Sequence, residues 1–283
     1  MEGCSRDTQT LSPSRRHMAQ GYCRYLFCWF QHPHGMEEDE SEFNYIKGDE
    51  RGPEHWGELD EEWRACGNGR QQSPIALVKS EAVISPDLGE LRRNYYPANA
   101  TLENRGHDIM VKWATGAGSI EIEGRRYRLN QCHWHTPAEH TVNGRRYPLE
   151  MHLVHESEDK KIVVVGILYT YGRPDTFLAE LIDEIASIAD KEPPEVVLGM
   201  VNPKHIKIGS RKYYRYNGSL TTPPCTEGVT WNIVHKVRTV SREQVRALHM
   251  AIHDKYEKNA RPIQSTNERI VKLYTPKRNP QLH

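Results

Sequence analysis

The sequence predicts a mainly β fold of the α+β type: a single domain on a large, mostly antiparallel, twisted β-sheet with a few surface helices. From about residue 76 onward, apolar and polar residues mostly alternate, which is the two-residue period of a strand. Compact turn signals, Glu123-Gly124 and Asn143-Gly144, join several of these runs into hairpins. Only two segments have helical spacing, so most of the chain is expected to lie in the sheet.

The predicted strands begin after an aromatic N-terminal region. Residues before 76 form turns around Trp56 and Trp63. Asn104-Arg105-Gly106 is a further turn, which leaves His107 at the head of a strand. Later runs rich in Val and Ile, with no interior Pro, predict long strands. In chain order the predicted strands cover residues 107–113, 119–122, 125–129, 140–142, 145–147, 162–171 and 228–240.

Two helices are predicted from the spacing of their apolar residues. The first covers residues 175–191 and the second covers 241–256, where Ser241 and Gln244 have the form of a capping box. The apolar positions are Leu178, Leu181, Ile182, Ile185 and Ile188 in the first helix and Val245, Leu248 and Ile252 in the second.

The chain is predicted to hold one domain, residues 45–276, with a C-terminal tail at 277–283. Residues 1–44 mix polar, basic and acidic stretches that bury little apolar surface, which predicts a disordered or targeting tail. The apolar cluster at 25–30 is shorter than a signal-peptide core of about 7–15 residues, and no small-residue cleavage site follows it. No run approaches the roughly 18 apolar residues of a membrane span.

The composition favours a small-molecule partner. Hydrophobic residues make up 37% of the 283 residues and charged residues 27%, as in an ordinary globular protein. Lys plus Arg and Asp plus Glu number 38 each, so no net charge attracts nucleic acid or an anionic membrane. We therefore expect a small substrate, no nucleic-acid partner, no membrane span, and a monomer or weak dimer.

A group of histidines is the strongest candidate for a functional site. His133 and His135 are two residues apart, so their imidazoles project from one face of an extended strand. His152 lies on a second strand-like run and completes a three-nitrogen site if the two strands pair. Three neutral imidazoles with one open position are typical of a hydrolytic or hydrating zinc site. With 15 histidines in the chain, however, a His-x-His pair on a strand is more often an exposed or hydrogen-bonded pair.

The surroundings of these histidines favour the metal. Gln131, Glu139 and Glu150 are polar groups in a run that otherwise reads as buried sheet. Imidazoles that bind a metal need such hydrogen-bond acceptors for their second nitrogen.

Three stretches resemble an α-class carbonic anhydrase, and the plant members most. They are QCHWHTPAEHTVNGRRYPLEMHLVHE at 131–156, NGSLTTPPCTEGVTW at 217–231 and GPEHWGELDEEWRACGNGRQQSPI at 52–75. The resemblance covers about residues 45–275. It implies the α-carbonic anhydrase fold and the reversible hydration of carbon dioxide to bicarbonate by zinc-bound hydroxide. It also implies that Zn²⁺ is held by His133, His135 and His152, with Gln131 and Glu150 as partners of His133 and His152.

The resemblance implies roles for further residues. Thr221 and Glu139 match the pair that orients the hydroxide, Thr222 matches a residue that binds the product anion, and His107 matches the proton shuttle. A titratable relay is expected nearer the mouth of the site. The apolar wall for the substrate matches Val154, Val164, Leu220, Val229 and Trp231, with Thr221 beside it.

Two of the six cysteines, Cys66 and Cys225, match a disulfide of the secreted branch of the family. The alternative is two buried thiols, which a reducing cytosol favours. The secretory pathway, leading outside the cell or in plants to a plastid, therefore suits the pair, and the cytosol suits an uncleaved N-terminus.

A second function is open on the same scaffold, because plant relatives include tuber storage and nectar proteins with little activity. The three ligand histidines, Glu139 and Thr221 are all present here, which favours the enzyme.

Overall fold

The computed structural model describes residues 43–189, 191, 193–252 and 258–276. Within them, thirteen strands form one sheet, and β1, β8 and β9 form a small second sheet. Ten strands of the large sheet follow the path β12-β4-β5-β7-β10-β11-β14-β13-β16-β2. Off this path, β15 pairs with β11, β6 pairs with β7, and β3 pairs with β6. Residues 1–42 of the N-terminal tail predicted at 1–44, the C-terminal tail predicted at 277–283 and the end of the second predicted helix lie outside the described residues. Phe43 and Asn44, predicted to belong to the tail, are buried. No helix of the described part is long and apolar enough to cross a bilayer.

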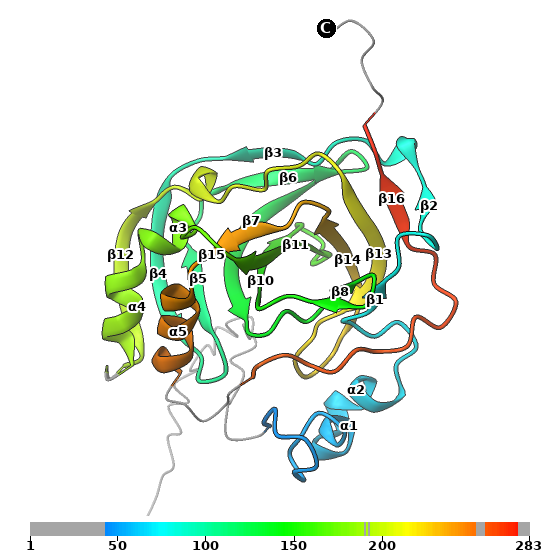
Figure 1. The fold of residues 1–283 in the computed structure, drawn as a ribbon, viewed down its shortest axis with the longest axis horizontal. Helices are drawn as coiled ribbons and strands as arrows, with labels where there is room; N and C mark the ends of the chain where they lie inside the picture. The colour runs from blue at the N-terminus through cyan, green and yellow to red at the C-terminus, as the bar shows by residue number, and fades with distance from the viewer. Residues whose placement is uncertain (1–42, 190, 192, 253–257, 277–283) are drawn as a thin grey trace, which may run out of the picture. The chain divides into compact units, whose positions relative to one another are not determined.

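The elements follow the chain in the order shown in Figure 1. The strands are β1 Ala76–Leu77, β2 Val83–Ile84, β3 Arg92–Tyr95, β4 Ala98–Asn104, β5 Ile109–Trp113, β6 Gly118–Ile122, β7 Arg125–His135, β8 Thr141–Val142, β9 Arg145–Arg146, β10 Leu149–Glu156, β11 Ile162–Tyr171, β12 Glu195–Val201, β13 Tyr213–Ser219, β14 Glu227–Val234, β15 Arg238–Val240 and β16 Lys272–Tyr274. The helices are α1 Trp56–Leu59, α2 Ala65–Asn68, α3 Thr176–Ala179, α4 Ile182–Ile188 and α5 Arg242–Ala251, with 3₁₀ turns η1 Glu61–Trp63, η2 Pro86–Leu88 and η3 Pro203–His205.

The sheet is mostly antiparallel, as predicted, but it is mixed. β7 pairs antiparallel with β10, and β10 pairs antiparallel with β11. β14 then lies parallel to β11, in a register that places Val164 opposite Trp231. Between β11 and β14 the chain passes through α3, α4 and then β12, which pairs with β4 at the far edge of the same sheet. It then forms β13, which pairs antiparallel with β14 and leaves β14 parallel to β11. Alternation along single strands carries no information about this crossing.

Both predicted hairpin turns are confirmed. Glu123 and Gly124 have φ angles of 52° and 76°, and Asn143 and Gly144 have φ angles of 49° and 76°. Two successive positive φ values are the geometry of the tight turn that matches strand twist, and glycine adopts it at no steric cost.

Two strand predictions need correction. The strand predicted from His107 begins at Ile109, because residues 105–108 form the turn between β4 and β5, where the Arg105 amide donates to the Asp108 carbonyl at 2.9 Å. The strand predicted over 228–240 is interrupted and forms β14 and β15, which pair with different parts of β11.

The first predicted helix is divided in two, and the second is confirmed over its described part. The break between α3 and α4 is tightened by amides of Glu180 and Leu181 that donate three residues back, which turns Leu181 into the core. In α5, the Ser241 hydroxyl and the Gln244 side chain form the predicted capping box. The Gln244 side chain also accepts from the Asp175 amide and donates to the Asp175 carbonyl, and Asp175 is the N-cap of α3.

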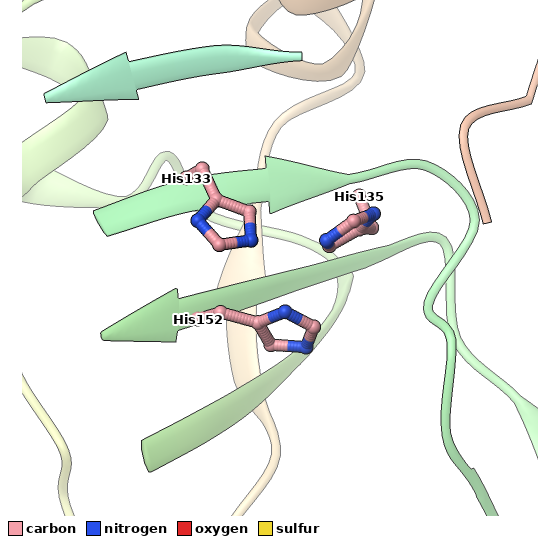
Figure 2. A group of neighbouring side chains, drawn as sticks. All are labelled: His133, His135 and His152. Atoms are coloured by element: carbon pink, nitrogen blue, oxygen red, sulfur yellow. The ribbon is translucent and has the colours of Figure 1, made fainter. Parts of the chain in front are cut away.

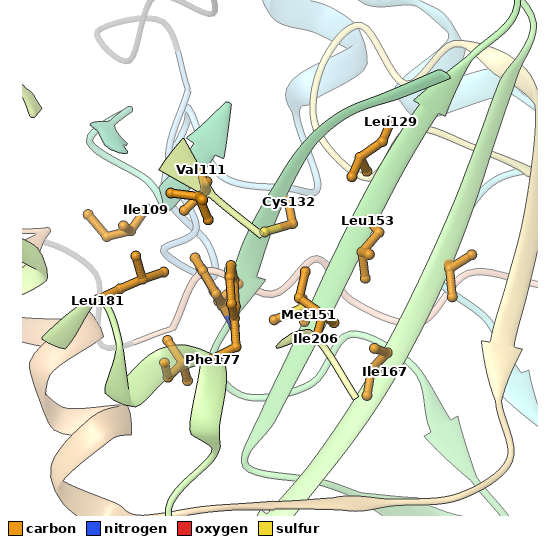
Figure 3. Packing of buried hydrophobic residues seen from close by; sticks show 14 of the residues in the cluster. Ile109, Val111, Leu129, Cys132, Met151, Leu153, Ile167, Phe177, Leu181 and Ile206 are labelled. Carbon is orange, nitrogen blue, oxygen red and sulfur yellow. The ribbon is translucent and has the colours of Figure 1, made fainter. Parts of the chain in front are cut away.

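The two faces of the sheet bury two different apolar clusters. The larger apolar cluster lies on one face, and Cys132, Met151, Leu153 and Phe177 are among the members labelled in Figure 3. Helices α4 and α5 pack against each other, and α4 also contacts β4 and β12 (Figure 1). The smaller cluster includes Trp231. Because side chains alternate along a strand, Cys132 faces the larger cluster, and the neighbouring His133 faces the other way.

Burial of His155 gives the fold a pH dependence. His155 of β10 is fully buried, accepts from the Tyr95 hydroxyl at 2.7 Å and donates to the Val163 carbonyl at 3.3 Å. Burial lowers its pKa to about 4 from 6.5. Between pH 6.5 and about 4, the imidazole of His155 is therefore protonated in the unfolded chain but not in the folded chain. The free energy of unfolding falls as the pH drops through this range.

We expect this histidine to contribute a loss of about 3 kcal/mol in the free energy of unfolding across that range. Urea titrations at stepped pH should show a shallower pH dependence for His155→Gln than for the parent. His55→Gln, at a half-exposed surface histidine, is the matched control and should keep the parent slope. Identical slopes for all three proteins would contradict the assignment.

Candidate metal centre

Three imidazoles converge on one point between the two central strands. β7 carries His133 and His135, β10 carries His152, and the antiparallel register places His152 directly opposite His133. Figure 2 shows the three rings turned toward one another. One nitrogen of each ring lies within 4.8 Å of the others, and all three residues are buried. The strand pairing that the sequence left open thus brings the predicted ligands together.

The second nitrogen of each ring is already hydrogen-bonded. His133 Nδ1 donates to Gln131 Oε1 at 2.8 Å, and His152 Nε2 donates to Glu150 Oε1 at 2.9 Å. His135 Nδ1 donates to the backbone carbonyl of Asn259 at 2.7 Å. These bonds fix each tautomer and leave one lone pair per ring. Gln131 and Glu150 stand where the resemblance expects them.

Asn259 is a functional residue that sequence reasoning missed. It lies 124 residues from His135 and acts on the ring through a carbonyl that every residue possesses. No residue type or spacing marks such an acceptor in a sequence.

The ring nitrogens that are not used in these hydrogen bonds are suited to bind a cation. His135 Nε2 is buried and has no hydrogen-bond partner among the described residues. Burial holds the pKa of His133 well below 6.5 and lowers the pKa of His152, which keeps both rings neutral. Three neutral imidazole nitrogens in a buried site are a donor set that Zn²⁺ prefers, and an unmet buried lone pair is costly without it.

A second cluster, formed by His140, Glu150 and His152, is a hydrogen-bonded network. Glu150 accepts from the His140 amide at 2.8 Å and from the ring nitrogens of His140 and His152 at 2.7 and 2.9 Å. Burial raises the pKa of Glu150, but these two histidines lower it more, so the pKa lies well below 4.5. The ring nitrogens that face Glu150 are therefore occupied by it, and the open lone pairs belong to the first cluster.

Glu139 lies close to the same site and is fully buried. Its Oε1 accepts from the Arg261 amide at 2.9 Å and lies 3.7 Å from His135 Nδ1. Its Oε2 is buried and has no partner in the part of the chain that the structure describes. Thr221, predicted to pair with Glu139, is 6% exposed and follows β13 in the loop to β14. Thr222 lies in the same loop, where its carbonyl accepts from the Cys225 amide.

The predicted apolar wall forms a row across the sheet beside His152. Val154, Val164 and Trp231 lie side by side on β10, β11 and β14. The Trp231 ring centroid is 4.7 Å from that of His152. Val154 is two residues after His152 and so shares its face. Val229 is buried in the smaller apolar cluster, which also holds Val164 and Trp231, and Leu220 packs against that cluster.

His107, predicted at the head of a strand, is a buried residue just before the strand. It belongs to the turn before β5, is 2% exposed, and packs against Phe43 and Tyr45 with ring centroids 5.3 and 6.4 Å away. Asp108 Oδ2 lies 3.8 Å from His107 Nε2 and is ion-paired with Arg105. Phe43, in the segment predicted as a tail, helps to cover the ring, which is why the local sequence gave no sign of its burial.

A disulfide joins Cys66 and Cys225, as the resemblance implied. It connects α2 with the loop that carries Thr221 and Thr222, and it packs with Phe43 and Trp56. Arg261, whose amide bonds Glu139, also donates its guanidinium to the Cys66 carbonyl at 2.9 Å. Cys132 is the free cysteine of the described part, and it is buried.

Comparisons with known proteins agree with this geometry. A family model described as eukaryotic-type carbonic anhydrase matches residues 51–275. Alpha carbonic anhydrase 7 of Arabidopsis thaliana is 58% identical over 243 residues, which are 86% of this chain and 88% of the relative. Dioscorin dioA3 of Dioscorea japonica is 47% identical over 82% of this chain and 86% of its own. A crystal structure of dioscorin complexed with ascorbate superimposes with a TM-score of 0.82 at 45% identity, covering 84% of this chain and all of the other.

Proposed function

Because the chain belongs to the eukaryotic-type carbonic anhydrase family, we propose that it catalyses the reversible hydration of carbon dioxide to bicarbonate and a proton, with Zn²⁺ as cofactor. One observation carries the proposal. Three buried imidazoles present lone pairs to a common point, and a hydrogen bond orients each ring from behind. When bound, Zn²⁺ makes hydroxide available near neutral pH, which is the nucleophile that hydration needs.

His133, His135 and His152 are the proposed ligands. Gln131, Glu150 and the Asn259 carbonyl hold the tautomers that leave the ligand lone pairs open. Burial lowers the pKa of His133 and of His152, which disfavours the imidazolium form of these two rings. These two rings therefore need to release no proton when the metal enters.

Thr221 and Glu139 are proposed to aim the nucleophile. Among the residues that the structure describes, the buried Oε2 of Glu139 has no hydrogen-bond partner, and a hydroxyl donor would satisfy it. If the Thr221 hydroxyl donates to Glu139, its oxygen can only accept from the reacting water. The lone pair of that water is then directed away from Thr221 toward the substrate.

The substrate is proposed to lie against the apolar row of Val154, Val164 and Trp231, completed by Val229 and Leu220. Carbon dioxide carries no net charge or hydrogen-bond donor, so an apolar wall beside the ligands suits it better than a polar one. Thr222, in the loop that holds Thr221, is proposed to bind the bicarbonate product.

A storage or nectar-type protein is the second candidate, favoured by the similarity to dioscorin in sequence and in structure. Stopped-flow measurement of carbon dioxide hydration separates the two. The enzyme should be active as purified, lose activity with a zinc chelator, and regain it when Zn²⁺ is added. A folded, zinc-loaded protein without activity would assign the chain to the storage class.

His107 is the proposed proton relay, because it matches the shuttle position of the family and an imidazole can both accept and release a proton. His107→Ala should lower kcat by roughly 10-fold or more at low buffer concentration. It should leave kcat/KM for carbon dioxide almost unchanged, because the relay acts after hydration. Added imidazole should restore kcat. Unchanged turnover in the variant would instead assign His107 a packing role, as its burial against Phe43 and Tyr45 would produce.

A further inference from the structure

The side-chain amide of Asn259 joins the segments on either side of a proposed zinc ligand. Its Oδ1 accepts from the Thr136 amide at 2.7 Å. Its Nδ2 donates to the Trp134 carbonyl at 3.1 Å and to the His107 carbonyl at 2.7 Å. The residue is 3% exposed. One planar amide therefore holds both peptide neighbours of His135.

The backbone of Asn259 contacts the same strand end. Its carbonyl accepts from His135 Nδ1 at 2.7 Å, and its amide donates to the Thr136 carbonyl at 3.1 Å. The segment from residue 258 to 263 has no regular secondary structure, so no ladder of a helix or strand fixes this carbonyl. Its position relative to His135 depends on the other bonds that Asn259 makes and on the anchor two residues later, where the Arg261 amide donates to Glu139.

We propose that the Asn259 side chain is a positioning residue for the metal centre: its amide aligns the Asn259 carbonyl with His135 and ties the turn of His107 to the same frame. The inference rests on the proposed zinc site. It assigns a role to the amide beyond that of the carbonyl. Gln131 and Glu150 orient their histidines from within the same strand, two residues away, whereas the acceptor for His135 comes from a distant loop that must be anchored.

Only an amide of this length satisfies the three side-chain bonds. Aspartate has the same shape and keeps the acceptor for Thr136, but it loses both donors and places a charge against two carbonyl oxygens. Alanine loses all three bonds. The Asn259 carbonyl remains in both variants, so a change in metal binding would trace to the side chain.

Asn232 offers a matched control. It is fully buried in β14 and also accepts one hydrogen bond, from Arg215 Nε at 2.7 Å. Its Nδ2 donates to the Val164 and Thr230 carbonyls, both at 3.4 Å. Its side-chain bonds involve none of the three histidines.

The test compares Zn²⁺ affinity, measured by competition with a chromophoric chelator on the metal-free proteins. Asn259→Asp and Asn259→Ala should bind Zn²⁺ roughly 10–100-fold more weakly than the parent, as expected when a group that orients a ligand is lost. Their Co²⁺-substituted forms should show an altered visible spectrum. Asn232→Ala should lower the melting temperature of the metal-free protein, yet leave Zn²⁺ affinity and the Co²⁺ spectrum as in the parent.

Two outcomes would overturn the inference. In one, the soluble Asn259→Asp protein keeps parental Zn²⁺ affinity and Co²⁺ spectrum. In the other, Asn232→Ala weakens Zn²⁺ as much as Asn259→Ala does, which would show a general effect of lost stability. A parent protein that binds no Zn²⁺ would instead defeat the proposed function, so the two failures are distinguishable.

Discussion

Replacing His135 with alanine is expected to abolish carbon dioxide hydration and to remove most of the zinc. Structural zinc sites with four ligands bind with about 10–16 kcal/mol, so one ligand contributes roughly 3–4 kcal/mol and its loss weakens binding on the order of 10³-fold. His135 is fully buried and packs closely against His152, with ring centroids 4.6 Å apart, so no neighbouring water readily replaces its nitrogen.

Elemental analysis after dialysis measures the metal, and stopped-flow assays measure the activity. His205→Ala is the control, because His205 is half-exposed and pairs with Glu180 at the surface. It should keep both zinc and activity. Full zinc content in His135→Ala would reject the ligand assignment.

Replacing Thr221 with alanine is expected to lower kcat/KM by about 10²–10³-fold while zinc content stays that of the parent. That range is typical of losing one preorganised hydrogen-bonding group at a reacting centre. The variant leaves the three imidazoles and their hydrogen bonds intact, so the loss isolates the aiming of the nucleophile from the binding of the metal.

The exposed Thr226 of the same loop supplies the control, since Thr226→Ala changes the loop composition without reaching the buried site. Glu139→Gln should approach the loss seen for Thr221→Ala, because the amide can donate toward Thr221 and disturb its orientation. If Thr221→Ala retains parental kcat/KM, or loses zinc, the proposed pairing with Glu139 is wrong.

Local chemistry in the sequence predicted much of the fold and the clustering of the three histidines. The turns at Asn143-Gly144 and Glu123-Gly124 follow from the positive φ values that glycine allows, and the shared face of His133 and His135 follows from the two-residue period of a strand. These features depend on residues close together in the chain, where alternation and turn chemistry carry the information.

The features that were missed depend on contacts between distant segments. The Asn259 carbonyl and the Arg261 amide are backbone groups, so no residue type announces them. The burial of His107 depends on Phe43, more than sixty residues earlier. The parallel register of β11 and β14 depends on the path through β12 and β13 that separates them in the chain. Such pairings are set by the packing of the whole domain.

The chain is similar both to proteins named carbonic anhydrase and to dioscorin. Because one scaffold can host different functions, the function must be argued from the residues of the site. Here the site retains every side chain that the proposed chemistry uses. The decisive comparison is therefore between metal binding and turnover in the same preparation.

The disulfide also sets an order of events during synthesis. Its two cysteines are 159 residues apart, so at a translation rate of about 5–20 residues per second the first thiol waits roughly 10–30 s for its partner. During that interval the ribosome delivers Cys132, which lies in β7 and is fully buried in the finished protein. A nascent chain in an oxidising compartment must therefore either shelter Cys132 early, by pairing β7 with β10, or rely on an isomerase to undo a bond between Cys66 and Cys132.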